Sequence, residues 1–452
     1  MTVIIHGWSD NAKSFTKLAG MLDNATVTNL YLGDYISLND AVTFEDLSDA
    51  LQRAWEAKGL SSAGPRSVDV IVHSTGGLII RHWLVKYYGN RISEIPIHRL
   101  VMLAPANFGS PLAHKGRSII GRVSLGWNWS NGKKLFETGA HLLQGLELAS
   151  PFTWRLAEKD LLADEGKSFY GKGKILCTVL TGNKQYDGIR ALISSPGSDG
   201  TVRVATANLL TRKIAIDLSE TPKKKNGITG TQGLVDERIG EREIAFGIMD
   251  GIDHSSIVAP KKGSVLFAYI KEALAVTDEG FSEWRAKLAQ TVANSTCEER
   301  FQNIVVHVTD TQGNDVEDFV LELFINNDKT TADRAMTRDL QRAIDDVHAN
   351  KGNPSYRCFF LNCEKLSADI LAKEADNPVL WLSITAMPDV DRDCVGYRTC
   401  SAKDIDSLQL AVEDMRKLFV PHETLLIEIK IQRFQKDNVF ALKTKREVEK
   451  EA

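Results

Sequence analysis

One stretch of this sequence constrains the fold more than any other, and it spans residues 68–81. Its first part, Val68–Val72, is short and rich in β-branched residues, which is typical of a buried strand. A turn that contains Ser74, Gly76 and Gly77 follows directly, and an apolar helix comes after it. The pattern predicts a sharp strand–turn–helix unit that presents the Ser74 Oγ above the edge of a sheet.

Both glycines suit such a turn, because the strand and helix backbones approach closely there and leave no room for larger side chains. Val72 departs from the usual Gly-x-Ser-x-Gly pattern, which has glycine at this position. The surrounding strand, turn and helix are otherwise complete, so Ser74 is a candidate nucleophile. The alternative is an ordinary tight turn between a strand and a helix.

Short apolar runs alternate with longer amphipathic segments up to about residue 290. This alternation predicts an α/β fold, in which helices cover both faces of a mainly parallel sheet. Active sites in such sheets lie on loops at the carboxyl ends of the strands. The expected strands are Val3–Ile5, Val68–Val72, Leu100–Leu103 and Ile175–Leu180, and the expected helices include Phe44–Lys58 and Leu78–Tyr88.

A second strand end supplies candidate donors for the oxyanion that forms when a serine attacks a carbonyl. Val3–Ile5 runs into a His-Gly pair, and the backbone N–H of the next residue, Trp8, is one expected donor. The N–H of Thr75 is the other. A His-Gly pair after a strand is by itself only a turn signal, but its place about 70 residues before Ser74 supports this interpretation.

His254 is the candidate general base. It follows the apolar run Ile244–Ile248 and precedes the predicted closing helix. In a serine hydrolase with this chain order, the histidine is expected on the loop after the last strand.

An acid that orients the histidine is expected between the serine and the histidine in the sequence. Asp199 fits best, because the loop Ser195–Val202 follows a predicted strand and is rich in small and turn-forming residues. Asp187 and Asp217 remain alternatives. Asp187 lies closer to the predicted strand, and Asp217 lies inside an alternating, strand-like run, which favours a structural role.

The segment from about 108 to 172 interrupts the alternation of strands and helices. It is long and mostly helix-like, so we expect an insertion or lid over the sheet. Exposed amphipathic aromatic side chains would suit a membrane interface, although core packing also explains such clusters. The aromatic residues concerned are Trp127, Trp129, Phe136, Phe152 and Trp154.

After about residue 290 the pattern changes to strands, several with period-two alternation. We expect a catalytic domain over residues 1–290 and a β-rich domain, most simply a sandwich, over residues 291–452. Asp310–Asn314 has the composition of a hairpin turn. A chain that ends near Gln290 is expected to fold, because the candidate catalytic residues and the closing helix are complete by Ala275. The expected strands are Ile304–Thr309, Phe319–Ile325, Arg357–Leu361, Val379–Ile384 and Leu425–Ile431, with helices near Ala332–Ala349 and Ser407–Leu418.

The composition excludes some classes of protein. Fifty-five basic and 59 acidic residues give a net charge of −4, which excludes a broad polycationic nucleic-acid binder. No stretch approaches the roughly 20 apolar residues that a membrane-spanning helix needs. The first residues lack the basic region of a signal peptide, so a cytoplasmic location is expected, with export by a signal-independent route left open.

The six cysteines show no spacing typical of a zinc site, and no metal ion is expected. Without a secretory signal, free thiols are favoured over disulfides. Cys394 and Cys400 are the pair for which a disulfide is most worth testing.

Together these motifs resemble the serine α/β-hydrolases. Within that superfamily they are similar to bacterial lipases and to esterases like GPI inositol-deacylase and lecithin–cholesterol acyltransferase. The similarity covers about residues 1–275, and the β-rich domain shows no such resemblance. The matching segments are Ile5–Trp8, Val72–Gly77, Ala104–Ser110, Ser198–Val202 and Asp253–Ser255.

The resemblance implies an α/β-hydrolase fold and a serine carboxylic-ester hydrolase of lipase or phospholipase type. In that reading Ser74 is the nucleophile, His254 the base and Asp199 the orienting acid, with Trp8 and Thr75 as the oxyanion hole. A lipid ester is the expected substrate, with peripheral membrane contact through the insertion or the second domain, and no cofactor or nucleic acid is implied. A small-ester esterase, an acyltransferase and a non-catalytic binding protein on the same scaffold remain alternatives.

Overall fold

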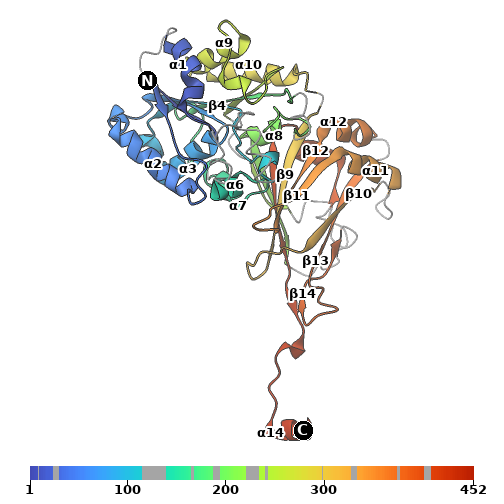
Figure 1. Ribbon diagram of the computed structural model, residues 1–452. Coiled ribbons are helices and arrows are strands. Elements are labelled where there is room, and N and C mark those ends of the chain that lie inside the picture. The colour runs from blue at the N-terminus through green and yellow to red at the C-terminus, as the bar shows by residue number, and fades with distance from the viewer. Residues whose placement is uncertain are drawn as a thin grey trace, which may run out of the picture.

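Figure 1 shows the computed structural model of the chain, with the N-terminal part on one side and the β-rich C-terminal part on the other. The structure describes residues 1–8, 10–23, 30–114, 139–163, 167–186, 194–219, 234–239, 243–297, 299–326, 333–373, 377–401 and 409–451.

A six-stranded parallel sheet forms the centre of the N-terminal part, in the order β2-β1-β3-β4-β5-β8. Several of its strands are buried along their whole length, as expected for a parallel sheet that is covered on both faces. This confirms the predicted α/β class. The strands are β1 (Thr2–Ile5), β2 (Leu30–Gly33), β3 (Val68–His73), β4 (Ile97–Leu103), β5 (Leu176–Gly182) and β8 (Ile244–Met249).

Helices cover both faces of this sheet. Val70 and Val72 of β3 point into a core shared with α2 and α3, whereas Ile71 packs with α1, α9 and α10 on the other face. The alternation of side chains along a strand requires this arrangement. The helices are α1 (Thr16–Asp23), α2 (Phe44–Ala57), α3 (Gly76–Tyr88), α9 (Val265–Ala273) and α10 (Phe281–Ala293).

The described C-terminal part holds a mixed six-stranded sheet, β11-β12-β9-β17-β6-β7, and a four-stranded sheet, β10-β13-β15 with β16 beside β13. Ile304 and Ile429 of the larger sheet share a core with Ile325 and Leu380 of the smaller one. This arrangement confirms the expected β-rich domain. The strands are β6 (Thr211–Leu218), β7 (Leu234–Ile239), β9 (Phe301–Asp310), β10 (Phe319–Asn326), β11 (Ile344–Ala349), β12 (Tyr356–Asn362), β13 (Val379–Ala386), β15 (Cys400–Ser401), β16 (Gln409–Leu410) and β17 (Thr424–Ile431), with helices α11 (Arg334–Ala343), α12 (Cys363–Leu366) and α13 (Val412–Leu418).

The six-stranded sheet is packed on both of its faces. Ile304 and Val306 of β9 point into the core between the two C-terminal sheets. Val305, between them, points into the core of the N-terminal part, together with Phe360 of β12 and Leu426 of β17. One sheet therefore contributes to two hydrophobic cores and joins the two parts of the chain.

The division at residue 290 does not separate the sheets. Strands β6 and β7 precede that boundary but belong to the C-terminal sheet, where Ile214 pairs in parallel with Ile427 of β17. The alternating side chains of Ile214, Ile216 and Leu218 all contribute to the core between the two C-terminal sheets. That burial is the physical reason why β6 lies in this sheet.

Two expectations for the C-terminal part are corrected. The helix expected over Ala332–Ala349 ends at Ala343, and Ile344–Ala349 is strand β11, which gains backbone hydrogen bonds from β12. The helix expected over Ser407–Leu418 covers only Val412–Leu418, with the short strand β16 before it, and residues 402–408 lie outside the described residues.

The turn at Asp310–Asn314 is present, with the Gly313 N–H donating to the Asp310 carbonyl at 3.0 Å. The residues beside it pair as a short hairpin, with an antiparallel bridge between Thr309 and Asp315 and a hydrogen bond from the Val316 N–H to the Val308 carbonyl at 3.0 Å, but the pairing does not extend along β9 and β10. Strand β9 already has β12 and β17 as neighbours, so β10 continues into the other sheet and pairs with β13. The turn therefore connects the two sheets of the C-terminal part.

The expected insertion at 108–172 contains the helices α4 (Pro111–His114), α6 (Ala140–Leu146) and α7 (Pro151–Asp160). Trp127, Trp129 and Phe136 lie outside the described residues. Trp154 does not form an exposed interfacial surface, because it is 3 % exposed and packs edge-on against His307 and Tyr356 of the C-terminal part. Helix α7 is thus part of the contact between the two parts of the chain.

A slender arm forms the C-terminal end of the described chain and projects from the body (Figure 1). It includes β18 (Phe434–Gln435), which pairs with β14 (Val395–Gly396), and helix α14 (Lys445–Glu451). Among the described residues no helix has the length and apolar character that crossing a membrane requires. All six cysteines are free thiols, so Cys394 and Cys400 are not joined by a disulfide.

The shared sheet predicts that a chain ending at Gln290 will not fold. Removal of residues 291–452 deprives β6 of β17 and exposes the core face that Val305 and Leu426 cover, and such an open strand edge promotes aggregation. We expect the truncated chain to be insoluble under conditions in which the full chain is soluble. A soluble truncated monomer with a cooperative thermal transition would contradict this account.

Candidate active site

Ser74 lies at the carboxyl end of β3, in the turn that leads into α3. Its φ angle is 53°, in the left-handed region that non-glycine residues rarely adopt. A Cβ on Gly76 would lie 3.0 Å from the carbonyl oxygen of His6, and one on Gly77 would lie 2.8 Å from the Cβ of Pro105. The turn therefore requires both glycines, and it holds the serine in a strained conformation that exposes its Oγ to the pocket.

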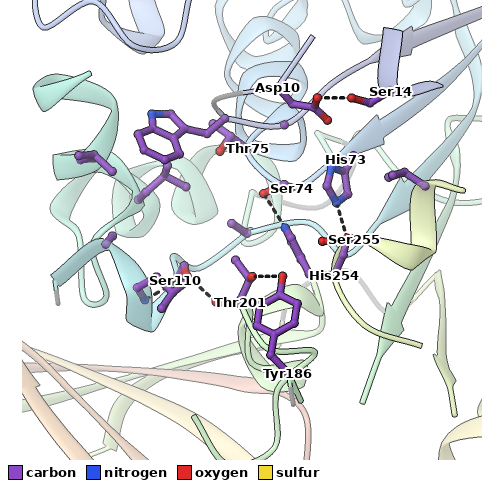
Figure 2. Close-up of a pocket in the computed structure, with 18 of the residues that line it drawn as sticks. Asp10, Ser14, His73, Ser74, Thr75, Ser110, Tyr186, Thr201, His254 and Ser255 are labelled. Atoms are coloured by element: carbon purple, nitrogen blue, oxygen red, sulfur yellow. Dashed lines mark hydrogen bonds between the residues drawn. The ribbon is translucent and has the colours of Figure 1, made fainter. Parts of the chain in front are cut away.

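The structure brings Ser74, His254 and Asp199 together, and Figure 2 shows the contact between Ser74 and His254. The Nε2 of His254 lies 3.1 Å from the Oγ of Ser74. The Nδ1 of the same ring lies 2.8 Å from the Oδ2 of Asp199. A continuous chain of hydrogen bonds thus connects the serine hydroxyl, the imidazole and a fully buried carboxylate.

The loop around Asp199 holds this carboxylate through backbone groups. The N–H groups of Thr201 and Val202 donate to its Oδ1 at 3.0 and 2.8 Å. The N–H of His254 donates to the carbonyl oxygen of Asp199 at 2.9 Å. The acid and the base are consequently linked through the main chain as well as through their side chains.

Asp187 and Asp217 were the two alternatives to Asp199 as the acid that orients the histidine. Asp187 lies outside the described residues. Asp217 is an exposed residue of β6, and its carboxylate accepts a hydrogen bond from the N–H of Ser219 and lies near Lys430. These contacts give Asp217 a local structural role in the C-terminal sheet.

The strand end at Gly7 lies directly against Ser74. A Cβ on Gly7 would lie 2.8 Å from the Cβ of Ser74. Trp8 and Thr75 both line the pocket, and within the described part of the chain neither backbone N–H has an acceptor. An oxyanion hole requires N–H groups that are free to donate, so Trp8 and Thr75 remain its candidate donors.

His6 orients one of these donors. It is fully buried, its ring stacks on Tyr35 with centroids 4.1 Å apart, and its Nδ1 donates to the carbonyl oxygen of Gly7 at 2.7 Å. In a trans peptide the C=O and N–H groups point in opposite directions. A fixed Gly7 carbonyl therefore fixes the direction of the Trp8 N–H.

His73 is a second histidine at the site to which the sequence analysis assigned no role. Its Nε2 donates to the backbone oxygen of His254 at 3.1 Å, and the two ring centroids are 4.6 Å apart. Burial holds the pKa of His73 well below its ordinary value, so the ring is neutral. His73 directly precedes Ser74 in the sequence, and this position was the signal that could have revealed its contact with His254.

Ser74 and His254 face a cavity of about 390 Å³. Tyr186 forms part of its wall, with its hydroxyl 3.0 Å from the Oγ1 of Thr201, and burial raises the pKa of Tyr186 (Figure 2). A pocket of this size suits a small molecule or one chain of a larger ligand rather than a whole macromolecule. Its apolar lining residues include Ala106, Leu112, Leu143, Leu146 and Val258. No three potential metal ligands gather within the described ranges.

Two solved structures of phospholipase PlaB from Legionella pneumophila resemble this chain over almost its whole length. One of them, a complex with thio-NAD, has a TM-score of 0.81, and the other has a TM-score of 0.80. In both comparisons the sequences are 25 % identical, and the match covers 98 % of this chain and 96 % of the other. No protein-family model matches the sequence, and no curated protein matches it.

The chain belongs to the serine α/β-hydrolase superfamily. The similarity to PlaB extends through the C-terminal part, which the sequence motifs did not cover. With this similarity to a phospholipase over almost the whole chain, the protein is a carboxylic-ester hydrolase.

Because Gly7 is closely packed, we expect that a methyl group added at this position will greatly lower the activity of this hydrolase. In the variant Gly7→Ala, the added Cβ would lie within 3.0 Å of both Ser74 and His73, so the serine turn must shift. Misplacement of about 1 Å costs on the order of 100-fold in rate, and we expect a loss of that size in kcat/KM. Gly20→Ala is the control, because a Cβ there meets nothing within 4 Å. Wild-type activity of Gly7→Ala in an ester-hydrolysis assay would refute the packing argument.

Proposed function

We propose that this hydrolase is a phospholipase that cleaves carboxylic-ester bonds of membrane lipids through an acyl-enzyme. The observation that carries the proposal is the hydrogen-bond chain from Ser74 through His254 to Asp199, located at the wall of a largely apolar cavity. The similarity to a phospholipase over both parts of the chain supports the choice of substrate.

The first half of the proposed reaction forms the acyl-enzyme. The Nε2 of His254 accepts the Ser74 proton as the Oγ attacks the ester carbonyl carbon. The carbonyl oxygen becomes an oxyanion, which accepts hydrogen bonds from the N–H groups of Trp8 and Thr75. When the tetrahedral intermediate collapses, His254 returns the proton to the leaving alcohol, and the acyl group stays on Ser74.

In the second half, water replaces the alcohol. His254 takes a proton from the water as it attacks the acyl carbon, and the same N–H groups stabilise the second oxyanion. Collapse of this intermediate releases the fatty acid and returns the proton to the Ser74 Oγ. Asp199 accepts a hydrogen bond from the Nδ1 of His254 throughout, which keeps the ring in the correct tautomer and stabilises the imidazolium.

The walls of the cavity favour a lipid acyl chain. The residues that line the cavity include Leu143 and Leu146 of α6, Leu112 of α4, and Val258 and Ala259. An aliphatic chain that leaves water for this surface gains roughly 0.8 kcal/mol per buried methylene group. A short, polar acyl group would gain little from the same walls.

Membrane contact through the C-terminal arm is a further part of the proposal. Leu442 and Phe440 are 91 % and 78 % exposed, which exceeds the exposure of the other large apolar side chains described. Lys443 and Lys445 adjoin them in the sequence, and apolar side chains flanked by basic ones suit the interface of an anionic bilayer.

The proposed catalytic roles predict a graded loss of activity. Ser74→Ala and His254→Ala should each lower kcat by about 10⁴-fold or more, and the double variant should be little worse, because the two residues act as a unit. Asp199→Asn should lower kcat by about 10³-fold or more, while the exposed, matched carboxylate variant Asp217→Asn should remain at the wild-type level.

Steady-state hydrolysis of p-nitrophenyl butyrate measures these effects, and a fluorophosphonate probe reports the reactivity of Ser74 directly. Near wild-type activity of Asp199→Asn, together with an inactive Asp187→Asn, would assign the acid to Asp187. A folded wild-type protein that forms no fluorophosphonate adduct would favour the binding-protein alternative.

The substrate proposal predicts fatty-acid release from phosphatidylcholine or phosphatidylglycerol vesicles. The double variant Phe440→Ser/Leu442→Ser should lose at least about tenfold in vesicle hydrolysis and retain its rate on p-nitrophenyl butyrate, because its active site is unchanged. Val347→Ser is the control, since Val347 is 70 % exposed but lies on β11. Turnover of the soluble ester without release of fatty acid from either vesicle would identify a soluble-ester esterase instead.

A further inference from the structure

Arg203 lies at the end of the loop that contains Asp199, and its side chain is almost completely buried. The loop is held at its base by an antiparallel bridge between Ser198 and Arg203 and by a hydrogen bond from the Val204 N–H to the Gly197 carbonyl at 2.9 Å. Arg203 also caps the short helix α8 (Val204–Ala207). Its side chain is 1 % exposed, so the protein must supply partners for the guanidinium charge.

Those partners all come from the C-terminal part. The guanidinium carbon lies 4.0 Å from the ring centroid of Phe360 and 5.2 Å from that of Phe301. The Nη2 of Arg203 donates to the Oδ2 of Asp345 at 2.7 Å and approaches the Oδ2 of Asp346 at 3.4 Å. A planar cation that stacks on an aromatic ring and pairs with carboxylates is an arrangement specific to arginine.

An irregularity in β11 makes the double carboxylate contact possible. Successive residues of a regular strand point to opposite faces, so Asp345 and Asp346 would not normally reach the same group. The register of β11 against β12 shifts between Asp345 and His348, and Asp346 has a φ angle of 48°. This bulge brings both carboxylates within reach of Arg203.

The loop that contains Asp199 makes a second close contact with the C-terminal part, at Gly197. Gly197 has a φ angle of 63°, and a Cβ there would lie 2.8 Å from the Cδ2 of Phe301 and 3.1 Å from the carbonyl oxygen of Glu299. Phe301 is the first residue of β9. The loop that contains Asp199 therefore packs against the start of β9 in the six-stranded C-terminal sheet.

We infer that Arg203 is a positioning residue, through which the C-terminal part of the chain holds Asp199 against His254. This inference rests on the proposed function, because it assigns Asp199 as the orienting acid. Its consequence is that the C-terminal part supports catalysis on every ester, including small soluble ones that bind no membrane. A domain that only delivered the enzyme to lipid would leave soluble-ester turnover untouched.

The variant Arg203→Met tests this role, because methionine keeps much of the apolar contact with Phe360 and removes the charge and the hydrogen bonds. On p-nitrophenyl butyrate we expect kcat to fall about 10- to 100-fold with KM within about twofold, since a displaced acid impairs chemistry more than binding. Fluorophosphonate labelling of Ser74 should slow by a similar factor. Arg203→Lys should recover little, because an ammonium group lacks the planar face that stacks on Phe360.

Lys213→Met is the matched control. Lys213 also spans the two parts of the chain, with ion pairs to Glu158 at 2.6 Å and to Glu428 at 2.8 Å, but it lies on β6 and makes none of the contacts that hold the acid loop. Its removal should leave kcat within about twofold of the wild-type value. Thermal unfolding of both variants shows whether each is folded at the assay temperature.

A mutant cycle with Asp199 separates positioning from general destabilisation. If Arg203 acts through Asp199, Arg203→Met should have little further effect on kcat in the Asp199→Asn background. An equal loss of kcat in both backgrounds, or wild-type kcat in folded Arg203→Met, would overturn the inference. If Arg203→Met does not fold, Asp345→Asn gives the same test with a smaller expected loss, because it removes only the negative charge of one of the two carboxylates.

The two proposals fail in different ways. Activity that survives Ser74→Ala would refute the proposed function and with it this inference. Activity that depends on Ser74 and Asp199 but not on Arg203 would refute the positioning role alone.

Discussion

The active site depends on close packing between the Ser74 turn and the neighbouring strand end. Gly7 touches the nucleophile so closely that a Cβ would lie 2.8 Å from the Cβ of Ser74, and Gly76 approaches the carbonyl oxygen of His6 in the same way. Strands β1 and β3 are parallel neighbours, so their carboxyl ends deliver these residues to one place. The contact brings Gly7, the residue before Trp8, against Ser74, which has a positive φ angle of 53°.

His254 and Asp199 are held by contacts that reach beyond the parallel sheet of the N-terminal part. Both backbone groups of His254 form hydrogen bonds. Its N–H donates to the carbonyl oxygen of Asp199, and its carbonyl oxygen accepts from the Nε2 of His73. The Asp199 loop in turn lies on Phe301 of the six-stranded sheet, which contributes one face to each of two hydrophobic cores. The catalytic geometry and the joining of the two parts of the chain therefore have a common structural basis.

Local signals predicted much of this structure, and long-range pairing was what they missed. The run into Ser74 and the chain order of Asp199 and His254 predicted which residues meet. The alternation of β6 predicted a strand, but nothing local says that β17, more than 200 residues later, is its partner. The role of Arg203 also escaped detection, because its partners Asp345 and Asp346 lie in a bulged strand that resembled the end of a helix.

The most direct test of the central claim is to detect the acyl-enzyme. The protein is mixed with phospholipid vesicles, quenched in acid within the first turnover, digested and analysed by mass spectrometry. The account predicts a fatty-acyl mass on the peptide that contains Ser74, and no such mass in Ser74→Ala. Rapid release of fatty acid with no acylated peptide, or with the acyl group on another residue, would contradict it.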